Sequence, residues 1–233
     1  MYQRKNIPLI IPNLQINNEN INRERVSKFL GILIDENLSW KNQISAVHTK
    51  VSRNLGILYK SRHILPKHLL RQLYFSFIHS HLSYGNIAWA STNKTKLFAL
   101  HRRQKQSIRA ICFKDRTTPS KPLFEELNIM NIYELNFFQI LCFTFKCKNG
   151  SAPEIFQNIY TLKGSGKYTT RSNQLHTPVI KSNYEKFIVT YRAPHLWNNL
   201  PNSISDNNDL SFISFKNEIK KHIKEIDDIF TFF

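Results

Sequence analysis

Lysine and arginine are the side chains whose number and placement point most clearly to a chemistry in this sequence. The chain has 233 residues and a formal net charge of +17. Residues 37–121 carry +15 of that charge, because Asp115 is the single acidic residue among them. A segment with one sign of charge repels itself and attracts a polyanion. The sequence therefore predicts binding to RNA, DNA or an RNA–DNA hybrid, in preference to acidic lipid or protein.

The candidate phosphate contacts are basic residues that lie on the predicted helices of this segment, away from the apolar positions. Phosphate contacts hold a duplex in place without reading its sequence, so we expect little base specificity. The candidates are Lys50, Arg53, Lys60, Arg62, Lys67, Arg71, Arg102, Lys105 and Arg109.

Acidic side chains form no pattern typical of nucleotidyl transfer, which needs two or three convergent carboxylates to hold two Mg²⁺ ions. The first 121 residues contain no adjacent pair of aspartates. Asp227 and Asp228 are adjacent, but they fall in the predicted terminal helix, where we interpret them as solvated charge. The sequence thus predicts no catalytic residue.

The remaining side chains predict neither a metal site nor a membrane anchor. Cys142 and Cys147 have no histidine beside them at zinc-ligand spacing, and we interpret them as buried, inert thiols. Together with Cys112 they make no disulfide framework and favour an intracellular location, nuclear or cytoplasmic. No apolar run approaches the length that spans a bilayer, so we predict no contact with a membrane.

Helices are the elements that would position the basic side chains. Apolar residues recur every three or four positions over residues 39–62, with Ser39 as the predicted N-cap. Pro66 suits the first turn of a second helix over 66–82, and a third helix is predicted over 94–114. Three helices with one apolar stripe each can share a core.

Strands are predicted before these helices. Residues 7–11, 14–16 and 26–34 are apolar runs separated by proline- and asparagine-rich turns, typical of a small antiparallel hairpin. Gly31 indicates a bend in the last strand or the close approach of another backbone. An isolated hairpin is marginally stable, so residues 1–35 are interpreted as the edge of something larger and as a candidate surface for self-association.

The charge excess ends at residues 117–122, where we place a boundary. A short helix at 123–127 and an apolar helix at 133–146 follow. A second hairpin is predicted from residues 175–180 and 187–191, and a terminal helix begins at Asp209 or Ser211. The fold class is α+β and predominantly helical, with an N-terminal β-hairpin, a three-helix bundle and an α+β tail.

Several motifs, in one order over residues 28–225, resemble the C-terminal part of the reverse transcriptase of LINE-type non-LTR retrotransposons of the jockey kind. Phe29-Leu30-Gly31 is similar to the primer grip of group II intron and LINE-type enzymes. Leu82-Ser83-Tyr84-Gly85-Asn86 resembles their thumb, and Gln104-Lys105 the segment that follows. Tyr191-Arg192-Ala193-Pro194 and Trp197-Asn198-Asn199-Leu200-Pro201 resemble the end of the same reading frame.

This resemblance implies a primer-grip hairpin over residues 1–35, a basic thumb over 36–116 and an α+β tail over 117–233. In that family the thumb holds the template–primer duplex against the palm. The fingers, the palm with its paired aspartates and the endonuclease have no counterpart in this sequence. We therefore expect no polymerase activity from this chain alone, a need for Mg²⁺ only in the complete polymerase, and the missing palm and fingers as partners. The alternatives left open are a non-catalytic nucleic-acid-binding module and a functionless transposon relic.

Overall fold

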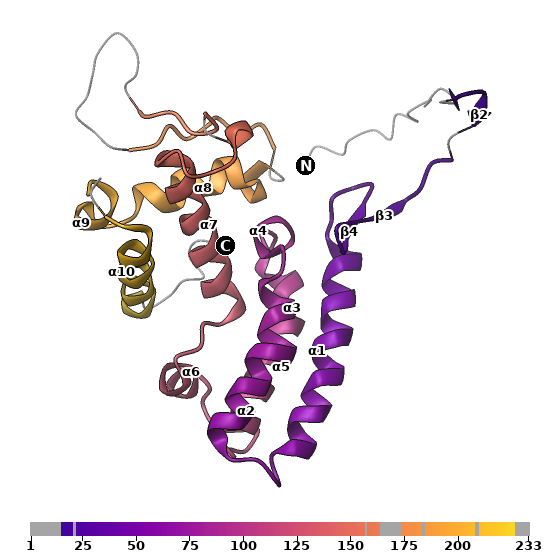
Figure 1. Cartoon of the computed structure of the whole chain (residues 1–233), viewed down its shortest axis with the longest axis vertical. Coiled ribbons are helices and arrows are strands. Elements are labelled where there is room, and N and C mark those ends of the chain that lie inside the picture. Colours follow the sequence, from indigo (N-terminus) through magenta and orange to yellow (C-terminus); the bar gives the residue numbers. More distant parts are fainter. Residues whose placement is uncertain are drawn as a thin grey trace.

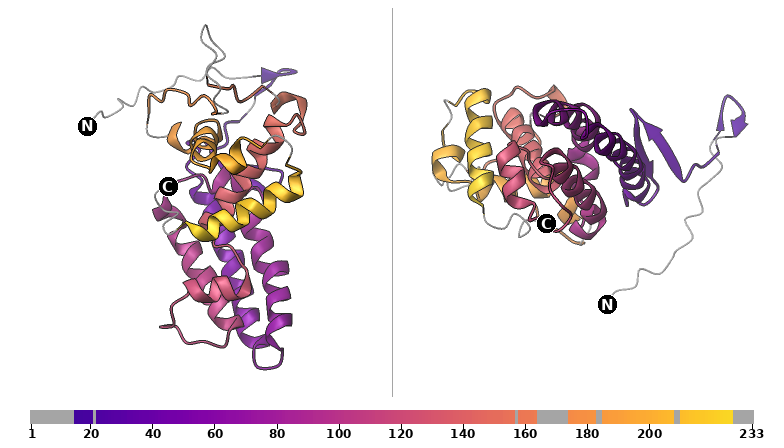
Figure 2. Two further views of the ribbon diagram at one scale, coloured as in Figure 1. Left: turned by 90° about the vertical axis from the view of Figure 1, so that its left-hand side faces the viewer. Right: turned by 90° about the horizontal axis from the view of Figure 1, so that it is seen from below.

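The computed structural model describes residues 15–20, 22–156, 158–163, 174–182, 185–207 and 210–226. Helices dominate this part of the chain, as the sequence predicted, and two small antiparallel hairpins precede them (Figure 1). The first hairpin extends away from the helices in Figures 1 and 2, whereas the second lies beside the start of α1.

The first hairpin pairs β1 (Gln15–Ile16) with β2 (Glu19–Asn20), and the second pairs β3 (Val26–Phe29) with β4 (Ile32–Asp35). The single strand predicted over 26–34 is therefore wrong. Leu30 and Gly31 have φ values of 46° and 81°, the positive values that a tight two-residue hairpin turn requires. The strand predicted over 7–11 lies outside the described residues.

Helix α1 (Lys41–Ser61) forms where the apolar spacing predicted it, with Val47, Val51 and Leu58 among its buried residues. Its N-cap is Trp40, in the left-handed conformation, so the prediction of Ser39 as the cap is wrong.

The preceding turn is organised instead by the buried carboxylate of Asp35. This group accepts hydrogen bonds from the backbone N–H groups of Asn37, Ser39 and Trp40 at 3.2, 3.0 and 2.9 Å. Burial opposes ionisation of the carboxyl, but these hydrogen bonds outweigh it and hold the pKa of Asp35 below its usual value.

The second predicted helix forms as one continuous rod with an irregular middle. It consists of α2 (Lys67–Tyr74), a π-helical turn η1 (Phe75–His79) and α3 (Ser80–Ser83). A short helix, α4 (Asn86–Trp89), then leads to α5 (Lys94–Ile111), the third predicted helix.

Helices α1 and α5 lie side by side and run in the same direction. Lys96 Nζ donates to Ser39 O at 2.9 Å near the start of both helices, and Arg103 Nε donates to His48 Nε2 at 3.3 Å one or two turns later. The rod of α2, η1 and α3 packs against α1, and α2 also contacts α5. The three-helix arrangement predicted from the sequence is thus present.

The rest of the chain packs on this layer through α7. After α6 (Lys121–Leu127), α7 (Ile132–Lys148) begins with a capping box between Asn131 and Glu134 and is buried on most sides. Two 3₁₀ turns, η2 (Glu154–Phe156) and η3 (Glu185–Phe187), lead towards the last helices.

Three helices complete the described chain: α8 (Val189–Asn198), α9 (Asn202–Ser205) and α10 (Phe212–Glu225). Helix α10 crosses α7 in Figure 2. Ser211 accepts a hydrogen bond from the Ser214 N–H and caps α10, as predicted; Asp209 lies outside the described residues.

The second predicted hairpin is wrong, because residues 187–191 belong to η3 and α8. The β-branched residues in this stretch favour a strand locally. The apolar residues that follow, Ala193, Leu196, Trp197 and Leu200, have helical spacing and are buried. Burying that face against α7 outweighs the local preference.

The core is one cluster of buried side chains that extends from Ile44 in α1 to Ile223 in α10. It includes Trp89, Phe137 and Trp197. The core therefore includes residues from both sides of the boundary that the change in charge predicts at residues 117–122.

Two buried polar side chains join helices within this core. Asn136 Nδ2 of α7 donates to Asn86 Oδ1 at 2.9 Å, and Asn136 Oδ1 accepts from Arg192 Nη1 of α8 at 3.1 Å. Gln104 of α5 donates to the Tyr74 hydroxyl at 2.8 Å and accepts from the Ile132 N–H at 2.9 Å. Several of the motif residues noted in the sequence thus have structural roles.

Candidate nucleic-acid interface

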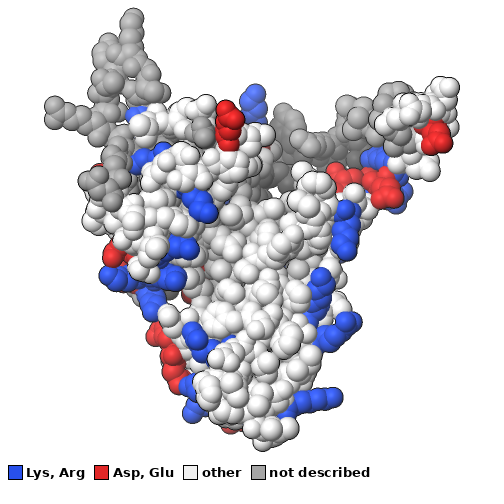
Figure 3. Space-filling view, in the orientation of Figure 1, with Lys and Arg blue, Asp and Glu red and all other residues white. Residues whose placement is uncertain are grey.

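The outer faces of α1 and α5 form the candidate interface. Neither helix contains an acidic residue. Their basic side chains are placed by the same periodicity that buries the apolar ones, because a residue half a turn from a buried position faces solvent. Figure 3 shows basic side chains spaced along the outer edge of α1.

Some of the predicted phosphate contacts on these two helices are exposed and form no ion pair within the described part of the chain. We call them the basic face. The basic face consists of Lys50, Arg53 and Lys60 on α1 and Arg102 on α5.

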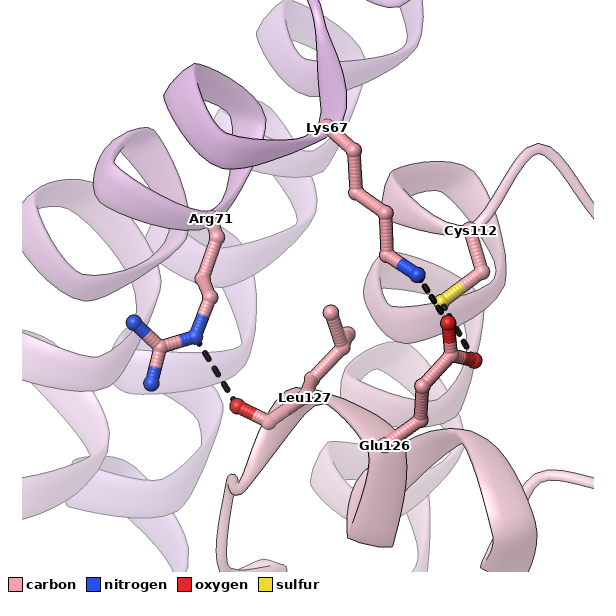
Figure 4. Close-up of polar contacts among 5 residues, drawn as sticks. All are labelled: Lys67, Arg71, Cys112, Glu126 and Leu127. Carbon is pink, nitrogen blue, oxygen red and sulfur yellow. Dashed lines mark hydrogen bonds and ion pairs between the residues drawn. The ribbon is translucent and has the colours of Figure 1, made fainter.

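Three other candidates have partners within the chain, and two of these attach α6 to α2 (Figure 4). The ammonium of Lys67 forms an ion pair with Glu126, and Arg71 Nε donates to Leu127 O at 2.9 Å. Arg109 Nε donates to Thr118 O at 2.8 Å and holds the loop before α6. Lys67, Arg71 and Arg109 stay predicted phosphate contacts, but each already has a partner within the protein.

The last two candidates are intermediate cases. Arg62 is half-buried at the C-terminal end of α1, with its guanidinium 5.7 Å from the centre of the Phe113 ring. Lys105 is half-buried and lines a pocket between α5 and α10. Sequence reasoning missed Lys41, which is exposed at the start of α1, although the charge count of the segment included it.

The residues that resemble a primer grip lie at the turn of the second hairpin. Phe29 and Leu30 are 64% and 73% exposed. The Tyr84 hydroxyl donates to Leu30 O at 2.6 Å, and Gly85, with a φ of 59°, lies against the Ile32 side chain. The Tyr84-Gly85 turn therefore holds the hairpin to the helices while its tip stays open to a partner.

The exposed edge of β3 leads us to expect concentration-dependent self-association. All four residues of β3 are exposed, and an unpaired strand edge is a template for another strand. Phe29→Lys should shift the molar mass measured by light scattering after gel filtration towards the monomer. Phe98→Lys, which replaces an exposed phenylalanine on α5 in the same way, should leave it unchanged. Equal effects of the two variants, or a wild type that stays monomeric at all concentrations, would contradict this role of β3.

No cluster of three or more His, Cys, Asp or Glu side chains suited to a metal ion occurs in the described residues. Burial raises the pKa of the Cys142 thiol to about 11, against a smaller opposing effect of nearby lysines, so this thiol is protonated and unreactive at neutral pH. Within the described ranges, no helix has the length and apolar character needed to cross a membrane.

Comparison of the chain with protein-family models, curated proteins and solved structures gives no match.

Proposed function

We propose that this chain binds nucleic acid duplexes through the basic face, in the manner of the thumb of a non-LTR retrotransposon reverse transcriptase. The observation that supports this proposal is the pair of parallel helices without acidic residues, on which the four cations of the basic face form no ion pair among the described residues. Cations in this setting are attracted to phosphate and release counterions when they bind.

The geometry favours binding without sequence specificity. The cations of the basic face are spread along two helices that lie side by side, so they can follow a phosphate backbone. The buried sides of the same helices are fixed in the core, which makes the surface rigid. Rigid phosphate contacts hold a duplex in place and discriminate little between bases.

A second proposal concerns the hairpin tip, which we infer docks on the missing palm of a complete reverse transcriptase. Phe29 and Leu30 favour this reading because they are large, apolar and exposed at the end of a two-stranded sheet. Without such a partner the chain would act as a nucleic-acid-binding module, and Mg²⁺ would be required only by the complete polymerase.

The test of the main proposal is a fluorescence-anisotropy titration of an RNA–DNA hybrid at several salt concentrations. For about four phosphate contacts, one for each cation of the basic face, the slope of log K against log salt should be near −4. The triple variant Arg53→Gln, Lys60→Gln, Arg102→Gln should flatten this slope by up to about three units, because about one unit is lost for each phosphate contact removed.

The matched control is Lys181→Gln, Lys186→Gln, Lys221→Gln, which removes the same charge from exposed positions near η3 and on α10. This control should change the slope much less than the basic-face variant does. A slope near zero for the wild type, or equal flattening by the two triple variants, would remove the basic face as the binding surface.

A further inference from the structure

A pocket of about 510 Å³ lies outside the basic face, and none of the four basic-face residues lines it. It lies between the α2–η1 rod, α5, α6, α7 and α10, so both halves of the chain contribute to it. This volume lies in the range of pockets that hold small molecules or cofactors.

The walls of this pocket combine aromatic rings with positive charge. Phe75, Phe124 and Phe138 line it. The Arg71 guanidinium lies 4.8 Å from the centre of the Phe75 ring, and Lys220 Nζ lies 5.8 Å from the centre of the Phe138 ring. Phe75 and Phe138 are therefore each next to a cation, an arrangement suited to a ligand that carries both a flat ring and negative charge.

The charge balance of the pocket favours an anion. Its basic side chains are Arg71, Lys105, Lys121, Lys220 and Lys224, whereas its carboxylates are Glu125 and Glu134. Glu134 is already engaged, since its two carboxylate oxygens accept hydrogen bonds from the Asn131 backbone N–H and side-chain amide. The cations exceed the carboxylates, and a phosphate would be attracted here.

The wall formed by η1 has two features that are unusual for a purely structural element. Its π-helical turn contributes Phe75 and His79 to the pocket, and such turns are found frequently at functional sites. Nδ1 of His79 is buried and has no hydrogen-bond partner within the described residues. An unsatisfied buried nitrogen lowers stability, which is a second sign that this wall is not purely structural.

We propose that this pocket binds one nucleotide, with its base beside Phe75 and Phe138 and its phosphate near Lys220 and Lys224. The nucleotide comes either from an unpaired end of a bound strand or from the free pool. The first source rests on the proposed function; the second does not.

The experiment compares a blunt RNA–DNA hybrid with a hybrid that has the same number of phosphates but ends in a three-nucleotide single-stranded extension. Wild type should bind the extended hybrid about tenfold more tightly, the size expected for one stacked base. In a second arm, saturation-transfer difference NMR measures binding of free AMP to the full chain.

The pocket variant is Lys220→Gln, Lys224→Gln, and a second variant is Phe138→Leu. Both should bring the affinity ratio of the two hybrids close to one and remove the AMP signal. The matched control Lys216→Gln, Lys221→Gln removes the same charge from α10 at positions that do not line the pocket. This control should keep the preference for the extended hybrid and the AMP signal. Circular dichroism and thermal unfolding check that each variant is folded.

The two arms separate the pocket from the basic face. If the chain binds no duplex but binds AMP through Lys220 and Lys224, the proposed function fails and the pocket takes free nucleotide. If wild type binds duplex with no preference for the extension and gives no AMP signal, the pocket proposal is overturned while the proposed function stands. A preference for the extension that persists in the folded pocket variants also overturns it.

Discussion

Replacing Arg192 with methionine is expected to lower the free energy of unfolding by about 2–4 kcal/mol, the range for disrupting a buried hydrogen-bonded network. Arg192 is 5% exposed and donates to Asn136 Oδ1 at 3.1 Å. Burial lowers the pKa of its guanidinium to about 10, so the group remains charged at neutral pH. Methionine keeps much of the length and apolar volume but leaves the Asn136 oxygen without this donor.

The consequence extends beyond one hydrogen bond, because Asn136 also donates to Asn86. Arg192, Asn136 and Asn86 thereby connect α8, α7 and α4 in the core. Loss of Arg192 should loosen the docking of α8 on α7, while helices α1 and α5 keep their packing against each other. Amide hydrogen exchange should show faster exchange in α8 than in α5.

Urea denaturation followed by circular dichroism measures the change, with Lys186→Met as the control for an exposed basic residue near the same helix. The Lys186 variant should lie within about 0.5 kcal/mol of wild type. A double-mutant cycle with Asn136→Leu should give a coupling energy of about 0.5–3 kcal/mol. An Arg192→Met variant as stable as wild type would contradict the structural role assigned to this network.

Acidification from pH 7 to pH 4 is expected to remove up to about 3 kcal/mol of stability through His101 alone, since each pKa unit corresponds to about 1.4 kcal/mol. His101 is buried beside Phe124 and Tyr133. Burial, with a smaller contribution from Lys105, lowers its pKa from 6.5 to about 4 against the opposing hydrogen bond with Gln104.

The direction of the change in stability with pH depends on whether the folded or the unfolded chain binds the proton more readily. The unfolded chain protonates at this histidine near pH 6.5, whereas the folded chain does so only near pH 4. The contribution to stability is therefore complete above about pH 6.5 and is lost as the pH falls towards 4. His48, His79 and His81 also have lowered pKa values, mainly because of burial, and their protonation adds to the loss.

The variant His101→Gln isolates the contribution of this residue. It lacks the titrating ring, so its unfolding free energy should fall less steeply than that of wild type between pH 6.5 and 4. Stability is measured by urea denaturation at a series of pH values, with His63→Gln as the control at an exposed position. Parallel profiles for wild type and His101→Gln would show that His101 does not couple folding to protons.

Long, strongly periodic segments determined their own structure. The sequence predicted the helices over 39–62, 66–82, 94–114 and 133–146 because one apolar stripe at helical spacing is sufficient to identify a buried face. It also identified the segment with the charge excess, since composition alone locates it. Short segments were predicted less well: the strand over 26–34 is a hairpin, and the hairpin strand over 187–191 is the start of α8.

The local secondary-structure preference of these short segments did not decide their conformation, because contacts with residues distant in the sequence outweighed it. Burial of Leu196 and Trp197 against α7 makes a helix of a stretch that begins with β-branched residues. Asp35, rather than Ser39, organises the turn before α1, since its carboxylate reaches three backbone N–H groups at once.

Some features of the candidate site are likewise determined by the sequence and others by the tertiary structure. The sequence determined that residues 37–121 are strongly basic, because charge is a property of composition. Only the tertiary structure decided which of these cations are available to phosphate. Lys67 and Arg71 contact α6, whose position depends on the packing of the second half of the chain, whereas Arg53 and Lys60 face solvent. The pocket is likewise a product of tertiary structure, since α5 and α10 meet around it only after the core that extends from Ile44 to Ile223 has formed.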